Sequence, residues 1–566
     1  NFMKAVQTKL VSTAGNEYAL NKFAAAHINP QNCVNCGKCR DICPVEAISE
    51  QQRIVCHLCP SCTSQPAITF DEMVELATEK SCTSACPLGI SPQGYVNLVR
   101  NGKEEDAFEV IWDKCPLPSV CGRICHHPCE QACKRGILVD EPIAIRGIKR
   151  YLTDNVEYVP QQYPKIYEEK IAVIGAGPAG LTAAHYLSLE GFDVTVFDSE
   201  TEAGGMMNRG IPKFRLPREA IAKDIERLEQ AGMKISLGER IGKPKMEELL
   251  KEYDAVIVAT GAPNSKELKI EGWRKEGVMT ALNFMERVNN GQEIWRHPGQ
   301  EFKLEGEVVV IGGGNVAIDS ARTAIRLGAQ KVTAVCLEMD ENVPCHSWEL
   351  ENAQEEGLTL LEGWSPQKFT GVHNELTGVE LCKVTKFEKA DDGKLIVETD
   401  KSQTKTLKAD WVIVAIGQNR DNIWNQFEEN EKVFFAGDVD KTECSVVDAM
   451  ADGKKAALKV ATKLESHKIK DKMDLRKLNL ADVNEKIYPA TRLKIMRPEL
   501  PVSDPEERAK NFNEVEMGYS RDTVETEVLR CLKCGYQQVD TDLCIGCGVC
   551  QTVCPEGDVI TMVSIQ

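Results

Sequence analysis

The sequence predicts an α/β fold with two Rossmann-like dinucleotide units and a cysteine-rich segment towards each end. Two glycine-rich turns, each between an apolar strand and a helix-forming segment, predict the two units. Of the 24 cysteines, all but Cys336, Cys345, Cys382 and Cys444 lie in the terminal segments. Because 566 residues exceed what one core usually supports, we expect several domains.

The composition narrows the class of protein. The net charge is −18, with 86 acidic against 68 basic residues, which disfavours nucleic acid or an anionic membrane as the main partner. There is no apolar run of about 18 residues and no secretory signal, so we expect a cytoplasmic protein without membrane insertion. In a reducing compartment, clustered cysteines with short spacings indicate metal or redox chemistry. Counted as four ligands each, the terminal cysteines predict four or five clusters.

Residues 1–75 predict a ferredoxin-like module. Cys33, Cys36, Cys39 and Cys43 have the C-x2-C-x2-C-x3-C-P spacing of bacterial ferredoxins, which wraps thiolates around a 4Fe–4S cluster. A zinc site would normally use two separated cysteine pairs. The run therefore predicts iron.

An incomplete second run follows in the same module. Cys56, Cys59 and Cys62 have the spacing of a second half, but Pro66 stands near the place of the fourth cysteine. In two-cluster ferredoxins the fourth cysteine of one run serves the other cluster, so Cys43 could complete this set. The spacing alone leaves open whether one or two clusters form here.

Residues 76–165 predict a small helical domain that holds clusters. Gln93–Val99 and Glu104–Trp112 have helical periodicity. His126 and His127 lie among the cysteines, and we interpret them as partly exposed loop residues because the even C-x3-C-x3-C spacing already supplies thiolates. The cysteines of this module are Cys82, Cys86, Cys115, Cys121, Cys125, Cys129 and Cys133.

Several motifs of residues 76–465 resemble one enzyme family. ACPLGI, CPLPSVCGRICHHPCEQAC, PIAIRGIKRY, VIGAGPAGL and GGMMNRGIPKFRLP are similar to motifs of the glutamate synthase small subunit and its relatives. Those relatives include part of dihydropyrimidine dehydrogenase and the large subunit of the NADH-dependent ferredoxin:NADP oxidoreductase. The resemblance implies a helical two-cluster domain, then an FAD domain into which a nucleotide domain is inserted. The two ferredoxin-like ends depart from the glutamate synthase subunit.

The resemblance also suggests one ligand set, with a departure. The family has an R-C-x2-C pair shortly before the position of Cys82, and this chain lacks it. The string LRCLKC near the C-terminus supplies Cys531 and Cys534 instead. We hypothesise that the chain end folds back, so that these two cysteines join Cys82 and Cys133 in one cluster.

A second cluster of the helical domain is expected on Cys86, Cys125 and Cys129. Some relatives use Gln or Glu as its fourth ligand, at the position that Lys149 occupies here. Because lysine is implausible as a ligand, Cys121 is the candidate.

The first Rossmann unit lies in the predicted FAD domain, residues 166–285 and 405–465. A short apolar strand runs into a glycine triplet that permits a tight turn, the approach of the backbone to a pyrophosphate, and close helix packing. The helix N-terminus faces the phosphates. The next strand ends at Asp198, 23 residues after the first glycine, where a carboxylate can accept from a ribose hydroxyl. The residues expected at this site are Gly175, Gly177, Pro178, Ala179, Gly180, Asp198, Gly204 and Gly205.

Two strand-to-turn crossings return the chain to the FAD domain. YDAVIVATGA contains Thr260 and Gly261, and DWVIVAIGQ contains Gly417. Crossings of this type occur in reductases with two dinucleotide units. In the later string VFFAGD, the resemblance implies that Gly437 lets the backbone approach the flavin and that Asp438 binds its ribityl chain.

The second Rossmann unit lies in residues 286–404 and predicts a site for NAD(P)H. After the turn VVVIGGGNVAID, the next strand ends at Glu338, 26 residues after the first glycine. A carboxylate there accepts from a free 2′-OH and repels a 2′-phosphate, so we favour NADH, although Arg322 or Arg326 could still reach a phosphate. The residues expected at this site are Gly312, Gly314, Asn315, Val316, Ala317 and Glu338.

The C-terminal segment contains a linker and a further module. Residues 466–525 are polar and contain several prolines, and they predict an extended linker without chemistry of its own. Residues 526–566 carry a second complete ferredoxin run, so we expect a C-terminal ferredoxin-like module. The cysteines of this run are Cys544, Cys547, Cys550 and Cys554.

One FAD site, one nicotinamide site and several clusters predict an oxidoreductase that converts hydride transfer into single-electron transfer. This chemistry requires no acid–base side chain, and we name none. A disulfide reductase is disfavoured, because no C-x2-C or C-x4-C lies beside either Rossmann unit.

The clusters at both ends suggest redox partners. We expect ferredoxin or another subunit of a complex, such as a bifurcating transhydrogenase, a hydrogenase or a formate dehydrogenase assembly of an anaerobe. The alternatives are a non-catalytic electron-relay subunit and a glutamate synthase small subunit.

Overall fold

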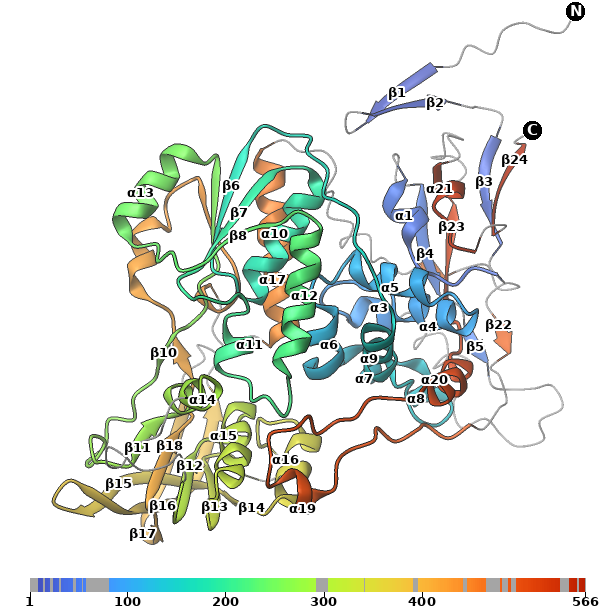
Figure 1. The fold of residues 1–566 in the computed structure, drawn as a ribbon. Helices are drawn as coiled ribbons and strands as arrows, with labels where there is room; N and C mark the ends of the chain where they lie inside the picture. Colours follow the sequence, from blue (N-terminus) through green and yellow to red (C-terminus); the bar gives the residue numbers. More distant parts are fainter. Residues whose placement is uncertain are drawn as a thin grey trace, which may run out of the picture.

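The structure, a computed structural model, is shown in Figure 1. It describes residues 9–13, 16–20, 24–29, 32–43, 47–52, 54–56, 81–291, 304–339, 342–389, 395–440, 445–464, 479–480, 487–489, 495–539, 549–556 and 559–564. None of the helices in these ranges is long and apolar enough to cross a membrane.

A five-stranded parallel sheet in the order β20-β9-β6-β7-β8 forms the first α/β domain. Its central strand β6 is buried from Ile171 to Ile174, which accounts for the uninterrupted apolar run there. Helices α10 and α17 pack against each other beside this sheet (Figure 1). The elements are β6 (Lys170–Ile174), α10 (Pro178–Glu190), β7 (Asp193–Phe197), α11 (Met206–Arg209), α12 (Arg218–Gln230), β8 (Lys234–Ser236), α13 (Lys243–Glu252), β9 (Ala255–Val258), η1 (Asn422–Phe427), β20 (Val433–Phe435), η2 (Gly437–Val439) and α17 (Val446–Lys463).

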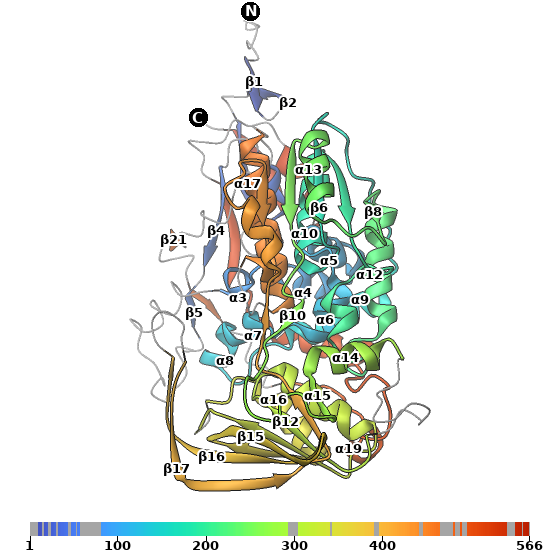
Figure 2. The ribbon, with the colours of Figure 1, turned by 90° about the vertical axis from the view of Figure 1, so that its left-hand side faces the viewer.

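A second parallel sheet, in the order β11-β18-β12-β13-β14, forms the other α/β domain. An antiparallel sheet, β15-β16-β17, lies beside it and extends the lower edge of the molecule in Figure 2. The elements are β11 (Val278–Thr280), α14 (Ala281–Asn289), β12 (Glu307–Ile311), α15 (Asn315–Arg326), β13 (Lys331–Cys336), α16 (Ser347–Glu355), β14 (Leu358–Glu362), β15 (Trp364–Val372), β16 (Glu375–Lys389), β17 (Leu395–Lys408) and β18 (Trp411–Val414).

Two short antiparallel strands connect the α/β domains. The chain leaves the first domain through β10 (Asn264–Ser265) and returns through β19 (Gln418–Asn419), which pairs with β10. The second domain is therefore inserted into the first, as the resemblance implies.

The helical domain lies beside the first α/β domain, and the two share one hydrophobic core. Helices α6 and α9 pack closely, since a Cβ at Gly122 would lie 2.9 Å from the Cα of Arg150. The helices are α3 (Cys82–Ala85), α4 (Pro92–Arg100), α5 (Glu104–Trp112), α6 (Pro118–Ile124), α7 (Pro128–Gln131), α8 (Lys134–Leu138) and α9 (Ile145–Asn155).

The two ends of the chain meet in one ferredoxin-like unit, to the right in Figure 1. Strand β24 pairs with β3 and strand β23 pairs with β4, both antiparallel, and helices α1 and α21 are in contact. The described cysteines of the two complete runs, although expected in separate modules, therefore lie in one folded unit. The elements of the two end segments are β1 (Lys9–Thr13), β2 (Asn16–Leu20), β3 (Ala24–Ile28), α1 (Lys38–Ile42), β4 (Ile48–Gln52), β5 (Ile54–Cys56), β21 (Asn479–Leu480), β22 (Ile487–Pro489), β23 (Gly535–Val539), α21 (Val549–Thr552) and β24 (Ile560–Ser564).

Residues 495–520 form a strap that runs from the helical domain to the nucleotide domain and back (Figure 1). The strap contains α19 (Pro505–Arg508) and is followed by α20 (Arg521–Glu527) and η3 (Val528–Arg530). An isolated bridge between Val502 and Glu516 closes it on itself. The expected plain linker is therefore partly folded.

Candidate functional site

The glycine turn of the first unit joins β6 to α10. Gly175 has a φ of +109°, and a Cβ there would lie 2.4 Å from the carbonyl oxygen of Ala259. A Cβ at Gly180 would lie 1.9 Å from the carbonyl oxygen of Gly175. Both positions therefore require glycine if the strand, the turn and the helix are to pack this closely.

Other segments close over this turn. A Cβ at Gly205 would lie 3.0 Å from the Cα of Gly177. From another side, η2 brings Gly437 to α10, where its Cβ would lie 2.8 Å from that of Ala179. The structure thus brings together three loops that are distant in the sequence.

Asp198 and Thr260 follow the strands on either side of β6. The Asp198 carboxylate accepts from the backbone N–H groups of Ala176 (2.6 Å) and Glu200 (2.9 Å), which fix it against the glycine turn. The Thr260 hydroxyl is buried and has no hydrogen-bond partner among the described residues. A polar ligand at this edge would satisfy that hydroxyl, so the site fits a dinucleotide.

The second unit repeats the turn between β12 and α15. Gly312 has a φ of +134°, and a Cβ there would lie 2.4 Å from the carbonyl oxygen of Ala415. Gly314 precedes α15, and no described atom lies within 4 Å of its Cβ position. The Asn315 side chain accepts from the N–H of His346 at 3.0 Å. The start of α15 is therefore open to a phosphate.

The remaining predicted nucleotide residues occupy different positions. Glu338 follows β13 at the carboxyl edge of the sheet. Ala317 is buried beneath the turn, whereas Val316 is 48% exposed on the first turn of α15. Gly417 lies in the connection back to the first domain, where its carbonyl accepts from the Lys266 N–H at 2.9 Å.

Arg322 and Arg326 are both buried. Both bind the buried carboxylate of Glu356, Arg322 at 2.6 Å and Arg326 at 2.5 Å. Both guanidinium groups also lie over the ring of Phe214. Burial alone would raise the pKa of Glu356, but these hydrogen bonds hold it at about 2. In this arrangement neither arginine is free to pair with a 2′-phosphate.

Cys33, Cys36 and Cys39 line one cavity together with Cys554 from the other end of the chain. Burial is the main reason why the pKa of Cys36 rises to about 12, and the neighbouring thiols add to the rise. The pKa of Cys39 also lies well above its usual range, for the same reasons. Grouped buried thiols of this kind ionise on binding a cation, so the set fits an iron–sulfur cluster.

Cys43 packs in the core of the ferredoxin-like unit with Cys550 and Cys554. Cys554 of the C-terminal run lies with Cys33, Cys36 and Cys39. In exchange, Cys43 of the N-terminal run lies near Cys550 of the C-terminal run. This crosswise placement is the one that two-cluster ferredoxins use. Cys59, Cys62, Cys544 and Cys547 lie outside the described residues, and only the backbone of Cys56 is described.

The hypothesised fold-back set is brought together in the helical domain. Cys82, Cys133, Cys531 and Cys534 line one cavity. Burial, followed by the charges of the other three thiols, holds the pKa of Cys82 well above its usual range.

A buried charge network fixes the LRCLKC segment in this place. Arg530 pairs with Glu527 (2.8 Å) and with Asp140 (3.0 Å). Arg135 binds both Asp140 oxygens (2.6 and 2.7 Å) and donates to the carbonyl oxygen of Arg530 at 2.7 Å. The hydrogen bond from Arg135 is the main cause of the low pKa of Asp140, about 2. Sequence reasoning missed this network.

Cys86, Cys125 and Cys129 form a second buried group in the helical domain. Burial raises the pKa of Cys125 to about 12, although the ammonium group of Lys149 acts in the opposite direction. Lys149 acts on Cys129 in the same way, and its side chain is buried. The position that carries a ligand in some relatives therefore places a positive charge against the thiols.

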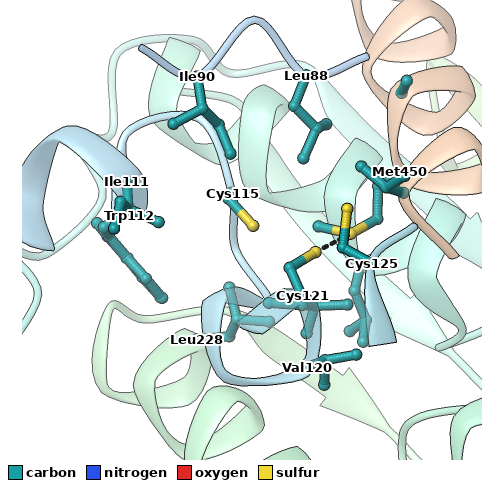
Figure 3. Close-up of a cluster of buried hydrophobic side chains, with 14 of the residues drawn as sticks. Leu88, Ile90, Ile111, Trp112, Cys115, Val120, Cys121, Cys125, Leu228 and Met450 are labelled. Atoms are coloured by element: carbon teal, nitrogen blue, oxygen red, sulfur yellow. Dashed lines mark hydrogen bonds between the residues drawn. The ribbon is translucent and has the colours of Figure 1, made fainter. Parts of the chain in front are cut away.

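Cys121, the candidate fourth ligand, has other contacts. Its thiol donates to the sulfur of Met450 at 3.6 Å (Figure 3) and also bonds Cys115. It is close enough to Cys125 to affect that residue's pKa. Cys115, which sequence reasoning did not single out, is fully buried beside it.

Within the described ranges, no three His, Cys, Asp or Glu side chains converge on a position for one metal ion. The thiolates of a 4Fe–4S cluster bind different iron atoms, so they surround the cluster and not a single ion. The lack of such a convergence among the described residues therefore does not conflict with clusters on the cysteine sets.

His126 and His127 lie at the joint between the helical and nucleotide domains. The ring of His126 stacks on His346 at 5.9 Å, and that of His127 lies 4.8 Å from Trp348. Both histidines are half-buried. The contact partners His346 and Trp348 gave no signal in the sequence.

Three family models match the chain. The pyridine nucleotide-disulphide oxidoreductase model matches residues 169–434. The model of dihydropyrimidine dehydrogenase domain II, 4Fe-4S cluster, matches residues 74–159. The 4Fe-4S binding domain model matches residues 26–49 and 538–558.

Curated relatives cover most of the chain. The beta subunit of the NADP(+)-dependent formate dehydrogenase of Moorella thermoacetica is 32% identical over 508 residues, covering 80% of this chain and 70% of its own. The NAD-dependent dihydropyrimidine dehydrogenase subunit PreT of Escherichia coli (strain K12) is 31% identical, covering 72% of this chain and 96% of its own. The small chain of glutamate synthase (NADPH) of Azospirillum brasilense is 28% identical, covering 66% and 84%. The chain belongs to this family of iron–sulfur flavoproteins.

Membership of the family agrees with the geometry described above. The chain is an NAD(P)H-dependent oxidoreductase whose cofactors are FAD, a nicotinamide nucleotide and multiple 4Fe–4S clusters. The two glycine turns fit the dinucleotides, and the buried thiol sets fit the clusters.

Proposed function

We propose that this chain exchanges electron pairs with NADH and single electrons with a partner redox subunit or ferredoxin. When bound, FAD accepts electrons in pairs and releases them singly, and each 4Fe–4S cluster carries one electron. The residues of the chain bind and orient these groups: the two glycine turns hold the dinucleotides, and the thiols hold the clusters.

The observation that carries this proposal is the position of helix α17. Gly453 packs against the flavin turn, where a Cβ would lie 2.1 Å from the carbonyl oxygen of Ala179. One turn earlier on the same helix, Met450 accepts from the thiol of Cys121 at 3.6 Å. One helix therefore contacts both the dinucleotide turn and the segment that carries the second thiol set.

We further propose the ligand sets. Two sets lie in the ferredoxin-like unit and two in the helical domain, and Cys56, Cys59 and Cys62 remain as an incomplete fifth. The four sets are Cys33, Cys36, Cys39 and Cys554; Cys43, Cys544, Cys547 and Cys550; Cys82, Cys133, Cys531 and Cys534; and Cys86, Cys125 and Cys129 with Cys121 as the candidate fourth.

Iron and sulfide analysis of anaerobically purified variants tests these sets. Cys531→Ala and Cys82→Ala should each remove the same cluster, with the same loss of iron. Unchanged iron content in both variants would refute the fold-back set.

A preference for NADH is supported by the surroundings of Glu338. A carboxylate at the end of the second strand accepts from the 2′-OH of NADH and repels the phosphate of NADPH. Arg322 and Arg326, whose positive charge would offset this repulsion, are bound to Glu356.

Anaerobic titration of the flavin absorbance with each nucleotide tests the preference. The wild type should bleach at lower NADH than NADPH concentrations, and Glu338→Gln should bind NADPH about tenfold more tightly, because removing the repulsion is worth about 1.4 kcal/mol. Glu362→Gln is the matched control, since it removes the same charge from the end of the neighbouring strand β14. Equal NADPH affinities in the wild type and Glu338→Gln would contradict the preference.

The same titration distinguishes a catalytic subunit from a non-catalytic electron-relay subunit. Bleaching of the flavin by either nucleotide in the isolated chain supports an enzyme, whereas no bleaching at full FAD loading supports a scaffold. The relatives named as formate dehydrogenase and dihydropyrimidine dehydrogenase subunits support a partner subunit as the electron acceptor or donor.

A further inference from the structure

One side of helix α4 contacts the first ferredoxin cysteine loop. A Cβ at Gly94 would lie 2.6 Å from the Cα of Cys36, so only glycine permits this approach. Three residues earlier, the Ser91 hydroxyl donates to the carbonyl oxygen of Asn35 at 2.6 Å. Helix α4 is therefore in backbone contact with the loop that carries Cys33 and Cys36.

Another side of the same helix contacts the fold-back set. The Asn97 side-chain amide donates to the sulfur of Cys531 at 3.4 Å. The Gln93 side chain exchanges two hydrogen bonds with the backbone of Gly535, at 2.6 and 2.7 Å. Gly535 follows Cys534, so both cysteines of the LRCLKC string are held against α4.

Charged contacts surround the joint between the ferredoxin-like unit and the helical domain. Lys114 pairs with Asp41 at 2.7 Å, and Lys38 pairs with Glu109. At the other end of α4, Lys103 donates to the carbonyl oxygen of Pro555 at 2.6 Å. Contacts along α5 and beyond the C-terminal end of α4 therefore fix the unit in one orientation.

We propose that α4 fixes the spacing between the set of Cys33 and the set of Cys82, with Gly94 and Asn97 as positioning residues. The inference rests on the proposed function: one cluster loses an electron and the other gains it, and no proton or covalent bond changes. The ferredoxin-like unit is then an internal continuation of the electron route and not an independent appendage.

Gly94→Ala tests the spacing in the full-length holoprotein. The added Cβ forces the loop at Cys36 away from α4, so reduction of that cluster by NADH, followed by freeze-quench EPR, should slow by about tenfold. The mutual broadening of the two reduced EPR signals should also decrease. Iron content and flavin bleaching should not change.

A second glycine-to-alanine substitution serves as the control. Gly242→Ala lies at the start of α13, with no described atom within 4 Å of the new Cβ, and should match the wild type. A wild-type rate and broadening in Gly94→Ala would overturn the inference, as would loss of iron from the set of Cys33. Failure of NADH to bleach the wild-type flavin would instead overturn the proposed function.

Asn97→Leu provides a second test, read as a redox potential. The Asn97 side-chain oxygen is buried and has no partner among the described residues, so the amide serves through its N–H group. Hydrogen bonds to sulfur favour the reduced cluster, so the reduced-to-oxidised ratio at a fixed potential should fall about tenfold, which equals 59 mV for one electron. Asn155→Leu, at the exposed end of α9, should leave it unchanged. An unchanged ratio in Asn97→Leu would contradict this role.

Discussion

The two Rossmann units share one motif, but their surroundings differ. Around the flavin turn, Gly205, Gly437 and Gly453 bring backbone within van der Waals contact, and α10 is buried on nearly all sides. At the nucleotide turn, Gly314 has open space at its Cβ position and Val316 is 48% exposed. The enclosed turn suits a cofactor that stays bound, and the open turn suits a nucleotide that exchanges.

The two domains are also attached differently. The flavin domain shares a core with the helical domain, and its Asp224 accepts from the backbone N–H groups of Ser119 (2.8 Å) and Val120 (3.0 Å). The nucleotide domain has cores of its own and is tied to the strap through Arg508, which binds Glu356 at 2.9 Å. We therefore expect that a substitution can increase local unfolding of the nucleotide domain without affecting the flavin domain.

Among the substitutions proposed here, Glu356→Gln is expected to cause the largest loss of folding stability. This change leaves Arg322, Arg326 and Arg508 buried without their shared carboxylate, which should cost about 3–5 kcal/mol. Hydrogen exchange should rise in the nucleotide domain and strap and stay unchanged in the flavin domain.

The matched control for this test is Glu355→Gln. Glu355 also pairs with Arg508, at 2.7 Å, but its side chain is 57% exposed, so the pair should be worth about 1 kcal/mol or less. Uniform loosening of both domains by Glu356→Gln would contradict the comparison.

The next largest loss of stability is expected at the third position of the glycine-rich turn, which is Gly180 in the flavin unit and Ala317 in the nucleotide unit. Gly180→Ala gives the flavin unit the residue that the nucleotide unit has naturally at Ala317. Because the new Cβ would lie 1.9 Å from a carbonyl oxygen, overpacking should cost about 3 kcal/mol and FAD should be lost on purification. The reverse change, Ala317→Gly, should cost about 1 kcal/mol, mainly in helix propensity. Comparable FAD loading in Gly180→Ala and the wild type, read from absorbance, would show that the two turns are equally tolerant.

The parts of the fold that the sequence predicted depend on contiguous residues. Each βαβ unit places strand, glycines, helix and acid within about 30 residues, so local periodicity is sufficient to find it. The insertion of one domain in the other followed from the resemblance, since strand spacing alone does not specify which sheet a returning strand joins.

The parts that could not be predicted depend on partners distant in the sequence. Cys554 lies with Cys33 because β24 pairs with β3, and short strands of this kind carry no signal for their partner. Glu356 binds Arg322 and Arg508 through tertiary packing, so spacing suggested a free Arg322. The fold-back of Cys531 could be predicted only because this chain lacks the cysteine pair that the family has shortly before the position of Cys82.

The smallest effect concerns His185, at the joint between α10 and the helical domain. Its ring is fully buried, bonds the Tyr163 hydroxyl at 2.8 Å and packs edge-on against Trp112. Burial lowers its pKa to about 3, below the value of about 6.5 in an unfolded chain. The neutral ring therefore stabilises the fold fully above pH 6.5, and this contribution is lost as the pH falls towards 3.

We expect wild-type stability to fall by about 1.4 kcal/mol per pH unit below 6.5 through this group, because the unfolded chain takes up a proton that the fold excludes. His185→Phe should remove that slope, measured as the difference in anaerobic thermal unfolding between pH 7.5 and 5.5. His373→Phe, on an exposed turn, should retain it. Parallel pH profiles for His185→Phe and the wild type would mean that the joint between the flavin and helical domains admits water, contrary to the tight attachment described above.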